Sequence, residues 1–430
     1  MTSPSDHFIQ NLPPKKGESE HLSPLQLAES LHHKAGFVWL DSSLPNLSPH
    51  HSFNQGEEIA QGLSILAYEP DLVLEGKADE WHLLEKELLR RQRSTLHPGF
   101  PEGAAIGFFR YDGSFRFSFY EKLYLHHTSL VESRWLTPLP KTIPKTKAPL
   151  PATLPPTARD PLHFQSNLSP EEYREMVRQA QEFIAAGDIY QVCLAHRFQC
   201  PFHGDPWPLY LSLRKKSPAP FAAYLQSGEE TILSSSPECF LKMSGQHIMT
   251  RPIKGTRPRR NNIEEDELQA LELKTSPKEI AELVMITDME RNDLGKICTY
   301  GSVVTSQLLH LERYPQVFHL VSTVEGELRP EISHVAALKS CFPGGSISGA
   351  PKRRAMEIIK ELEPIQRGLF TGAIGYFGFN GESQFSIAIR TLVISSTMAE
   401  FYVGAGITSD SLPNDEWEET LHKASGILQA

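Results

Sequence analysis

The sequence predicts a mixed α/β fold. Short apolar segments alternate along the 430 residues with amphipathic helices that begin at clear N-terminal caps, and the chain is long enough to bury a large core. No apolar run approaches the ~20 residues that a membrane-spanning helix needs. The net charge of −10 argues against a nucleic-acid-binding surface.

The N-terminal third divides by composition. Residues 1–20 are polar, lack the apolar core of a secretory signal, and are expected to be disordered. Residues 21–137 form an N-terminal segment with predicted strands at 36–40, 63–68 and 104–109 and an amphipathic helix at 79–92. Residues 138–167 are rich in proline and poor in large apolar side chains, which is typical of a linker or a surface crossover.

The five cysteines are odd in number, scattered, and without the C-x-x-C spacing of a zinc or redox site: Cys193, Cys200, Cys239, Cys298 and Cys341. This usage indicates a reducing compartment and core thiols. We therefore expect a cytoplasmic protein.

Residues 168–430 begin with a capped helix. Ser169 and Glu172 have the spacing of a capping box, Pro170 occupies the first helical position, and Gly187 follows the last apolar turn. The next segment, IYQVCLAHRF, alternates as a strand and places Gln191 on the same face as Cys193.

The segment 234–260 has two alternating strands, CFLKM and HIMTR, joined by a turn at Ser244 and Gly245. Glu238 precedes the first strand and Lys254 follows the second. A carboxyl and an amine near the ends of paired strands could act on one substrate as acid and nucleophile. Without further context, two solvated surface turns are the alternative.

Two later helices carry carboxylates. Ser276 and Glu279 have capping-box spacing at the start of one helix, which leaves Glu282 free one turn later. In the last helix, Glu416, Glu419 and Lys423 share one polar face. Solvated side chains are again the alternative, but carboxylate oxygens are also the ligands that Mg²⁺ prefers.

Five sequence motifs occur in a fixed order and resemble those of a known enzyme family: SSSPECF, RPIKGTRPR, KEIAELVMITDMERNDLGKI, CFPGGSISGAPKRRAMEII and GAGIT. Over residues 168–430 the chain resembles the chorismate-utilising enzymes, and among them the aminodeoxychorismate synthase component I branch, also called para-aminobenzoate synthase component I. The resemblance implies an α/β (α+β) body with two large packed β-sheets, helices outside, and a cleft between two lobes. Residues 168–430 are thereby expected to form the chorismate-binding catalytic domain.

The resemblance also implies roles for particular residues. Glu282 and Glu419 are expected to bind Mg²⁺ beside the ring carboxylate of chorismate. The residues expected to contact the dianionic substrate or its ring are Gln191, Thr256, His319, Tyr376, Arg390, Gly404, Gly406 and Lys423. Gln191 stands where relatives that add water to chorismate carry a lysine base, and an amide cannot act as a base near neutral pH.

Lys254 distinguishes between two amination reactions. Anthranilate synthases are similar to this chain but read PIAGT where PIKGT stands here. In the branch with lysine, the amine is expected to add to C2 of chorismate while Glu238 protonates the departing C4 hydroxyl. Ammonia then attacks C4 and expels the lysine, which gives 4-amino-4-deoxychorismate, a precursor of para-aminobenzoate and folate.

The chain contains no GxCxGxQ-like motif, which in glutamine amidotransferases holds the nucleophilic cysteine, and no recognisable lyase domain. Ammonia is therefore expected from a separate glutamine amidotransferase subunit, component II, with no nucleic-acid or membrane partner. Three other functions remain: anthranilate synthase component I, a non-catalytic subunit of the same fold, and a pyridoxal-phosphate enzyme with Lys254 as its Schiff base. No sequence motif that binds pyridoxal phosphate supports the last of these.

Overall fold

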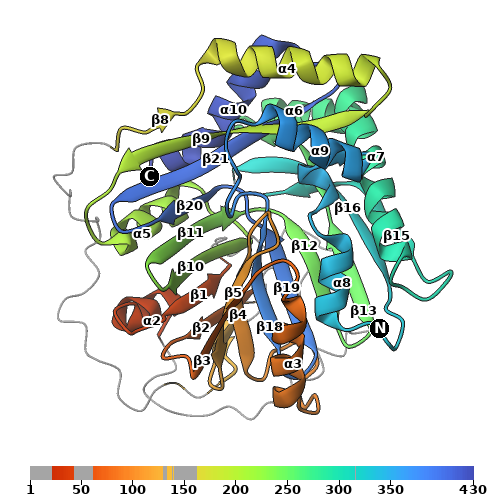
Figure 1. Ribbon diagram of the computed structural model, residues 1–430. Coiled ribbons are helices and arrows are strands. Elements are labelled where there is room, and N and C mark those ends of the chain that lie inside the picture. The colour runs from red at the N-terminus through yellow and green to blue at the C-terminus, as the bar shows by residue number, and fades with distance from the viewer. Residues whose placement is uncertain (1–21, 43–61, 129–132, 138, 140–161, 315) are drawn as a thin grey trace.

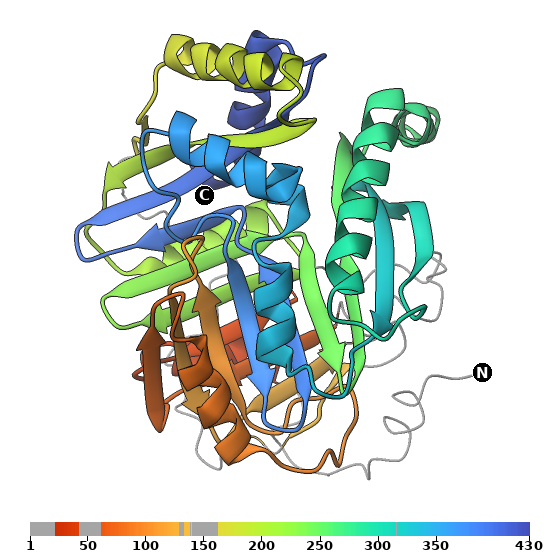
Figure 2. The same cartoon turned by 45° about the vertical axis from the view of Figure 1, so that its right-hand side comes forward.

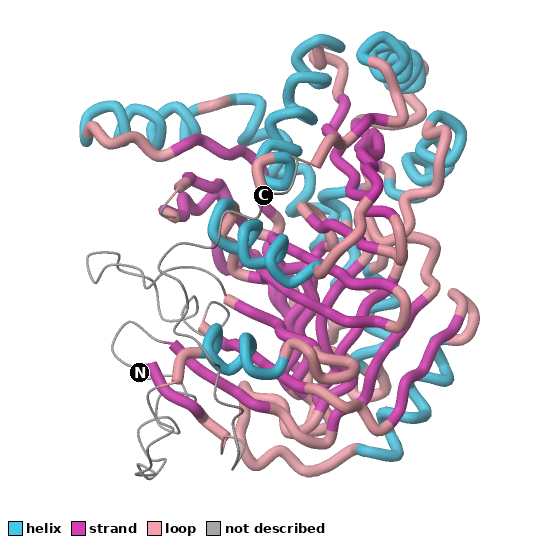
Figure 3. The backbone as a smooth tube through the Cα atoms, turned by 90° about the vertical axis from the view of Figure 1, so that its left-hand side faces the viewer, coloured by secondary structure: helices cyan, strands magenta, loops and turns pink. Residues whose placement is uncertain are grey.

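The computed structural model describes residues 22–42, 62–128, 133–137, 139, 162–314 and 316–430. Two large antiparallel sheets form the centre of this part of the chain, and helices cover them (Figure 1). In the tube view the strands lie inside and most helices lie at the periphery (Figure 3).

The first sheet has 11 strands among the described residues, in the spatial order β17-β9-β21-β20-β11-β10-β1-β2-β6-β7, with β8 also paired to β9. Its strands are β1 (Val38–Asp41), β2 (Leu63–Ala67), β6 (Tyr124–Thr128), β7 (Ser133–Trp135), β8 (Gln165–Ser166), β9 (Gln191–Pro201), β10 (Phe221–Ser227), β11 (Glu230–Ser236), β17 (Gly349–Ala350), β20 (Thr391–Ile394) and β21 (Met398–Ile407).

The second sheet has 10 strands among the described residues, in the order β14-β16-β13-β12-β19-β18-β4-β5-β3, with β15 also paired to β16. Its strands are β3 (Leu72–Gly76), β4 (Ala104–Phe109), β5 (Phe115–Tyr120), β12 (Cys239–Ser244), β13 (His247–Arg251), β14 (Ile253–Pro258), β15 (Val304–Arg313), β16 (Val317–Glu327), β18 (Ala373–Gly378) and β19 (Glu382–Ile387).

The N-terminal segment contributes strands to both sheets. β1 pairs with β10 in the first sheet, and β4 pairs with β18 in the second, where Phe109 lies opposite Ala373. Buried side chains of both sheets meet in one apolar cluster that includes Ile65, Ile106 and Ile374. Residues before and after the proline-rich segment therefore share one core. Residues 1–20 and most of 138–167 lie outside the described residues.

The helices are α2 (Pro24–Leu31), α3 (Trp81–Arg91), α4 (Pro170–Ala185), α5 (Pro206–Lys216), α6 (Ile263–Thr275), α7 (Pro277–Gly295), α8 (His334–Cys341), α9 (Lys352–Leu362) and α10 (Pro413–Leu428), with a 3-10 turn, η1, at Gly345–Ile347. Helices α4, α9 and α10 pack on β9 and β21, whereas α6 and α7 pack on β14, β15 and β16. In Figure 2 the first group lies at the upper left and α6 and α7 lie at the right; Lys352 of α9 and Asp293 of α7 form an ion pair where the two groups meet. No helix in the described ranges is both long enough and apolar enough to cross a membrane.

Local sequence signals explain the helix starts. Ser169 and Glu172 form the complete capping box at α4, and Gly187 adopts a φ of +81° beyond its end. At α7 only half of the predicted box forms: the Ser276 hydroxyl accepts the Glu279 N–H, but the Glu279 carboxylate lies 3.5 Å from Arg257 instead of returning to Ser276. Pairing with a cation is the stronger interaction for that carboxylate.

Candidate active site

Lys254 lies in β14 and points toward α7. Its Nζ is 3.8 Å from Oε2 of Glu282, and both side chains are largely buried. Gly255, the next residue, has a φ of +75°, and a Cβ there would lie 2.6 Å from Leu273 and 2.9 Å from the Glu279 carboxylate. Glycine is thus required for β14 to approach α6 and α7 closely enough to bring Lys254 to Glu282.

Glu238 lies where the chain crosses from one sheet to the other, between β11 of the first sheet and β12 of the second. Its side chain is 6% exposed, and burial raises its pKa to about 6, although hydrogen bonds from the Ser346 hydroxyl and the Ile253 N–H and the charge of Lys254 oppose this. The carboxyl therefore keeps its proton to a higher pH than an exposed glutamate does. Such a group can serve as a general acid.

Arg390 lies at a second crossing between the sheets, from β19 to β20, directly beside the first. The Ile387 N–H donates to the Glu238 carbonyl, and the Ser235 N–H donates to the Arg390 carbonyl. Arg390 adopts a φ of +49°, and burial lowers the pKa of its guanidinium. Burial is the cause of this shift, and no carboxylate of the described residues is paired with Arg390. A desolvated, uncompensated cation is suited to bind an anionic ligand.

His319 and Thr256 lie next to this cation. The Thr256 hydroxyl is 3.0 Å from Nδ1 of His319 across the β14–β16 pair. Burial, with the positive charge of Arg390, lowers the pKa of His319 to about 4, so that the imidazole is neutral at physiological pH. A neutral imidazole offers one donor and one acceptor.

Strands β9 and β21 of the first sheet form the opposite wall. A Cβ on Gly406 would lie 2.3 Å from Nε2 of Gln191 and 3.6 Å from Nζ of Lys254, so this wall approaches Lys254 directly. Gln191 is buried, and its Oε1 has no hydrogen-bond partner. The Lys423 ammonium donates to the Gly404 carbonyl at 2.9 Å. The buried Oε1 of Gln191, which lies on the wall that approaches Lys254, is therefore able to accept a hydrogen bond from a ligand.

Glu282 and Glu419 were expected to hold Mg²⁺. The charge of Lys278 interacts with four carboxylates of α7 and α10, namely Glu279, Glu282, Glu416 and Glu419. Burial alone would raise the pKa of Glu419, but Lys423, 2.7 Å away, lowers it overall and keeps this carboxylate ionised. Within the described ranges, no group of three or more His, Cys, Asp or Glu side chains is arranged to hold a metal ion. Because Mg²⁺ takes only one or two carboxylates from a protein, with water and substrate as its other ligands, these two residues still fit this ion.

The comparison with protein families decides the class of this protein. Residues 53–429 match the family model for chorismate binding enzyme. The chain belongs to the chorismate-binding enzymes.

Individual relatives come from two branches of this family. This chorismate-binding enzyme is 44% identical over 286 residues to anthranilate synthase component 1 of Thermus thermophilus, which covers 66% of this chain and 62% of that protein. It is 40% identical over 302 residues to aminodeoxychorismate synthase component 1 of Bacillus subtilis, which covers 70% of this chain and 62% of that protein. The chain thus spans less than two thirds of the length of either relative.

Solved structures agree with the fold. Anthranilate synthase component I from Streptococcus pneumoniae superposes with a TM-score of 0.74 at 27% identity, over 97% of this chain and 100% of that one. The isochorismate synthase MenF of Escherichia coli, at 18% identity and a TM-score of 0.73, covers 99% of this chain and 97% of its own, and shares the fold alone. The prediction of a mixed α/β body with two large sheets and outer helices is confirmed.

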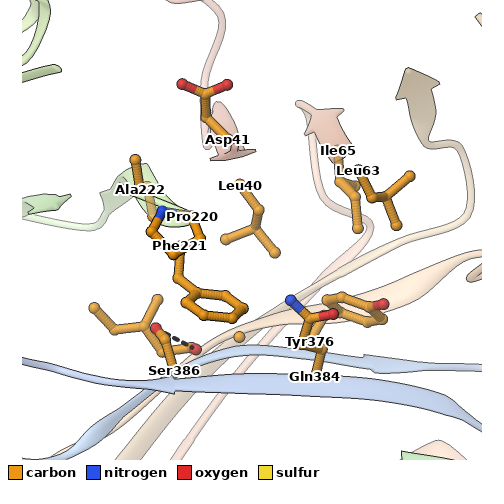
Figure 4. Close-up of a pocket in the computed structure, with 13 residues that line it drawn as sticks. Leu40, Asp41, Leu63, Ile65, Pro220, Phe221, Ala222, Tyr376, Gln384 and Ser386 are labelled. Atoms are coloured by element: carbon orange, nitrogen blue, oxygen red, sulfur yellow. Dashed lines mark hydrogen bonds between the residues drawn. The ribbon is translucent and has the colours of Figure 1, made fainter. Parts of the chain in front are cut away.

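Tyr376 is buried in β18 of the second sheet. It lines a cavity of about 40 Å³ between the two sheets, with Leu40, Asp41 and Phe221 among the other lining residues (Figure 4). None of the other residues expected at the site from the sequence lines this cavity. The alternation of β18 points Tyr376 toward the first sheet.

Sequence reasoning also missed two residues that contact the site. Ser346, in η1, hydrogen-bonds Glu238, and Lys278, at the start of α7, lies among the four carboxylates. Ser346 belongs to the glycine-rich segment FPGGSISGAPK, for which the sequence predicts only a structural role beside the site. Lys278 had no signal, because α7 and α10 are far apart in the sequence.

Proposed function

We propose that this chain converts chorismate and ammonia to 4-amino-4-deoxychorismate. The observation that carries the proposal is the position of Lys254. Its amine lies between the β9–β21 wall and Glu282, and its charge interacts with Glu238. A nucleophile and an acid of raised pKa thus share one site, as the substitution of a C4 hydroxyl through a covalent adduct requires.

The residues act as follows in this proposal. The Lys254 amine forms a bond to C2 of the ring, the double bonds shift, and the C4 hydroxyl leaves as water with the proton of Glu238. Ammonia then bonds to C4, the double bonds shift back, and the C2–N bond to Lys254 breaks. The adduct nitrogen keeps both of its protons, so Lys254 leaves C2 as the neutral amine with which it began. The new ammonium group on C4 gives one proton to the Glu238 carboxylate, and the enzyme returns to its starting state.

The remaining groups bind the substrate. Arg390 binds one carboxylate of chorismate through its bidentate fork, beside the neutral His319 and the Thr256 hydroxyl. Glu282 and Glu419 would hold Mg²⁺, which when bound supplies positive charge for the ring carboxylate. Ammonia would come from a separate glutamine amidotransferase subunit.

A second candidate is anthranilate synthesis, because relatives that carry this name match the chain at 44% and 47% identity. In that reaction ammonia attacks C2 directly, and no lysine adduct forms. The two reactions therefore differ in product and in their need for Lys254.

The test is a product assay with chorismate, Mg²⁺ and excess ammonium at mildly alkaline pH, followed by chromatography with and without an added aminodeoxychorismate lyase. We expect para-aminobenzoate only when the lyase is present. Lys254→Ala should lose this activity by several orders of magnitude, whereas Lys274→Ala, an exposed lysine of α6, should keep it. Intact-mass measurement without ammonia should show a chorismate adduct that Lys254→Ala lacks. Accumulation of fluorescent anthranilate would support the second candidate and reject the first.

A further inference from the structure

The inner face of α7 carries a buried carboxyl to which the proposed reaction assigns no role. Glu290 is 3% exposed, and its Oε1 accepts the Gly345 N–H at 2.9 Å. Its Oε2 is buried and has no hydrogen-bond partner. Burial of a half-satisfied carboxyl is costly, so a functional explanation is warranted.

The turn that Glu290 holds is the turn that contacts the proposed acid. Gly345 and Ser346 are consecutive residues of η1: the N–H of the first donates to Glu290, and the hydroxyl of the second hydrogen-bonds Glu238. A Cβ on Gly345 would lie 2.5 Å from Met289, so glycine allows the turn to lie directly on α7. The position of the Ser346 hydroxyl therefore depends on α7 through Glu290.

Among the described residues, the cation that acts on Glu290 is Lys352, and no ion pair joins the two side chains. The Lys352 ammonium donates to Asp293 and, at 2.9 Å and 2.8 Å, to the carbonyls of Cys341 and Pro343. Three acceptors use all three of its N–H donors. Two carboxylates of like charge, Asp293 and then Glu238, act on the Glu290 carboxyl and raise its pKa.

We propose that Glu290 is a positioning residue for the acid: it fixes the Gly345–Ser346 turn against Glu238, and its negative charge disfavours ionisation of Glu238. This inference rests on the proposed function, in which Glu238 donates a proton. The other groups facing the pair are Lys352, Asp293 and Cys341 around Glu290, and Lys254 and Lys423 around Glu238. The lysines favour ionisation of the pair. The charge of Glu238 raises the pKa of Glu290, and because such an interaction is reciprocal, an ionised Glu290 opposes ionisation of Glu238.

The direction of the pKa shifts agrees with this geometry. Burial raises the pKa of Glu290 to about 7; Lys352 opposes the rise, and the charges of Asp293 and, after it, Glu238 add to it. Two carboxyls that interact in this way titrate as a pair. At pH 8, where Glu290 is mostly ionised, a larger fraction of Glu238 keeps its proton than it would beside a neutral residue.

The experiment is an infrared titration of the protonated-carboxyl band in the full chain, with the double variant E238Q/E290Q as the reference. Each single variant, E290Q and E238Q, reports the remaining carboxyl alone. We expect the second proton to leave the wild type at a pH higher than in either single variant, by on the order of one pH unit. A wild-type curve equal to the sum of the two single-variant curves would overturn the proposal.

Kinetics provide the second readout. At pH 8, E290Q should lower kcat roughly three- to tenfold, the same factor as the lost protonated fraction, and leave KM unchanged because Glu290 touches no substrate in the proposed function. D288N, on the exposed face of α7, is the matched control and should behave as the wild type.

Ser346→Ala removes a hydrogen bond that favours ionised Glu238, so it should raise the pH at which Glu238 titrates, while E290Q should lower it. Shifts in the same direction would indicate unspecific disturbance and reject the proposal. Full turnover in E238Q would instead refute the proposed acid, a result that the substrate-free titration does not depend on.

Discussion

Replacing Glu238 by glutamine should stabilise the folded protein at neutral pH while it impairs turnover. In the folded state burial raises the pKa of this carboxyl from the ordinary 4.5 to about 6. Because the folded pKa is the higher one, the native state loses stability, relative to a neutral side chain, as the pH rises from about 4.5 through 6. At ~1.36 kcal/mol per pH unit, the difference amounts to about 2 kcal/mol.

The assay is urea unfolding of the wild type and Glu238→Gln at several pH values between 4 and 8. We expect no difference near pH 4, where Glu238 is protonated in both states, and a growing advantage of the variant that reaches about 2 kcal/mol above pH 7. Glu418→Gln, which changes an exposed carboxylate of α10, is the control and should show no pH-dependent gain. A difference between Glu238→Gln and the wild type that is the same at pH 4 and pH 8 would refute the reasoning, because burial would then not oppose the charge.

Three further substitutions test the site and its support. Arg390→Lys, which loses the bidentate fork, should raise KM for chorismate about tenfold or more; an unchanged KM would remove Arg390 from the substrate site. Gly406→Ala should lower kcat at least tenfold with unchanged circular dichroism, because its Cβ would lie 2.3 Å from Gln191, and Gln191→Ala in the same chain should recover part of the loss. Glu363→Gln should cost about 3–5 kcal/mol in urea unfolding, since it leaves the buried Arg367 guanidinium without its carboxylate; a cost below 1 kcal/mol would contradict this.

Local signals in the sequence were sufficient for individual elements. The capping box at Ser169 and the alternation after residue 190 predicted α4 and β9, and the Ser244–Gly245 turn predicted the β12–β13 hairpin. These predictions depend on contacts between residues a few positions apart, which periodicity and turn chemistry reveal directly.

The assembly of the site could not be predicted in this way. Gly406 approaches Lys254 only because β21 and β14 belong to different sheets that meet at this point, and the two residues are far apart in sequence. The resemblance, and not the periodicity, supplied the grouping of Lys254, Glu282 and Arg390, and of these the structure brings Lys254 and Glu282 to 3.8 Å of each other. Glu290 gave no signal, since one more glutamate in a charged helix is usually solvated.

The pairing of β4 with β18 has a consequence for synthesis of the chain. Phe109 lies opposite Ala373, so the two strands are separated by about 260 residues, and at ~5–20 residues per second a ribosome needs roughly 10–50 s to supply the second strand. During that time one edge of the very apolar segment AAIGFF has no native neighbour. We therefore expect nascent chains that end before residue 373 to depend on chaperones and to aggregate without them, whereas the full-length chain can cover this edge with its own residues.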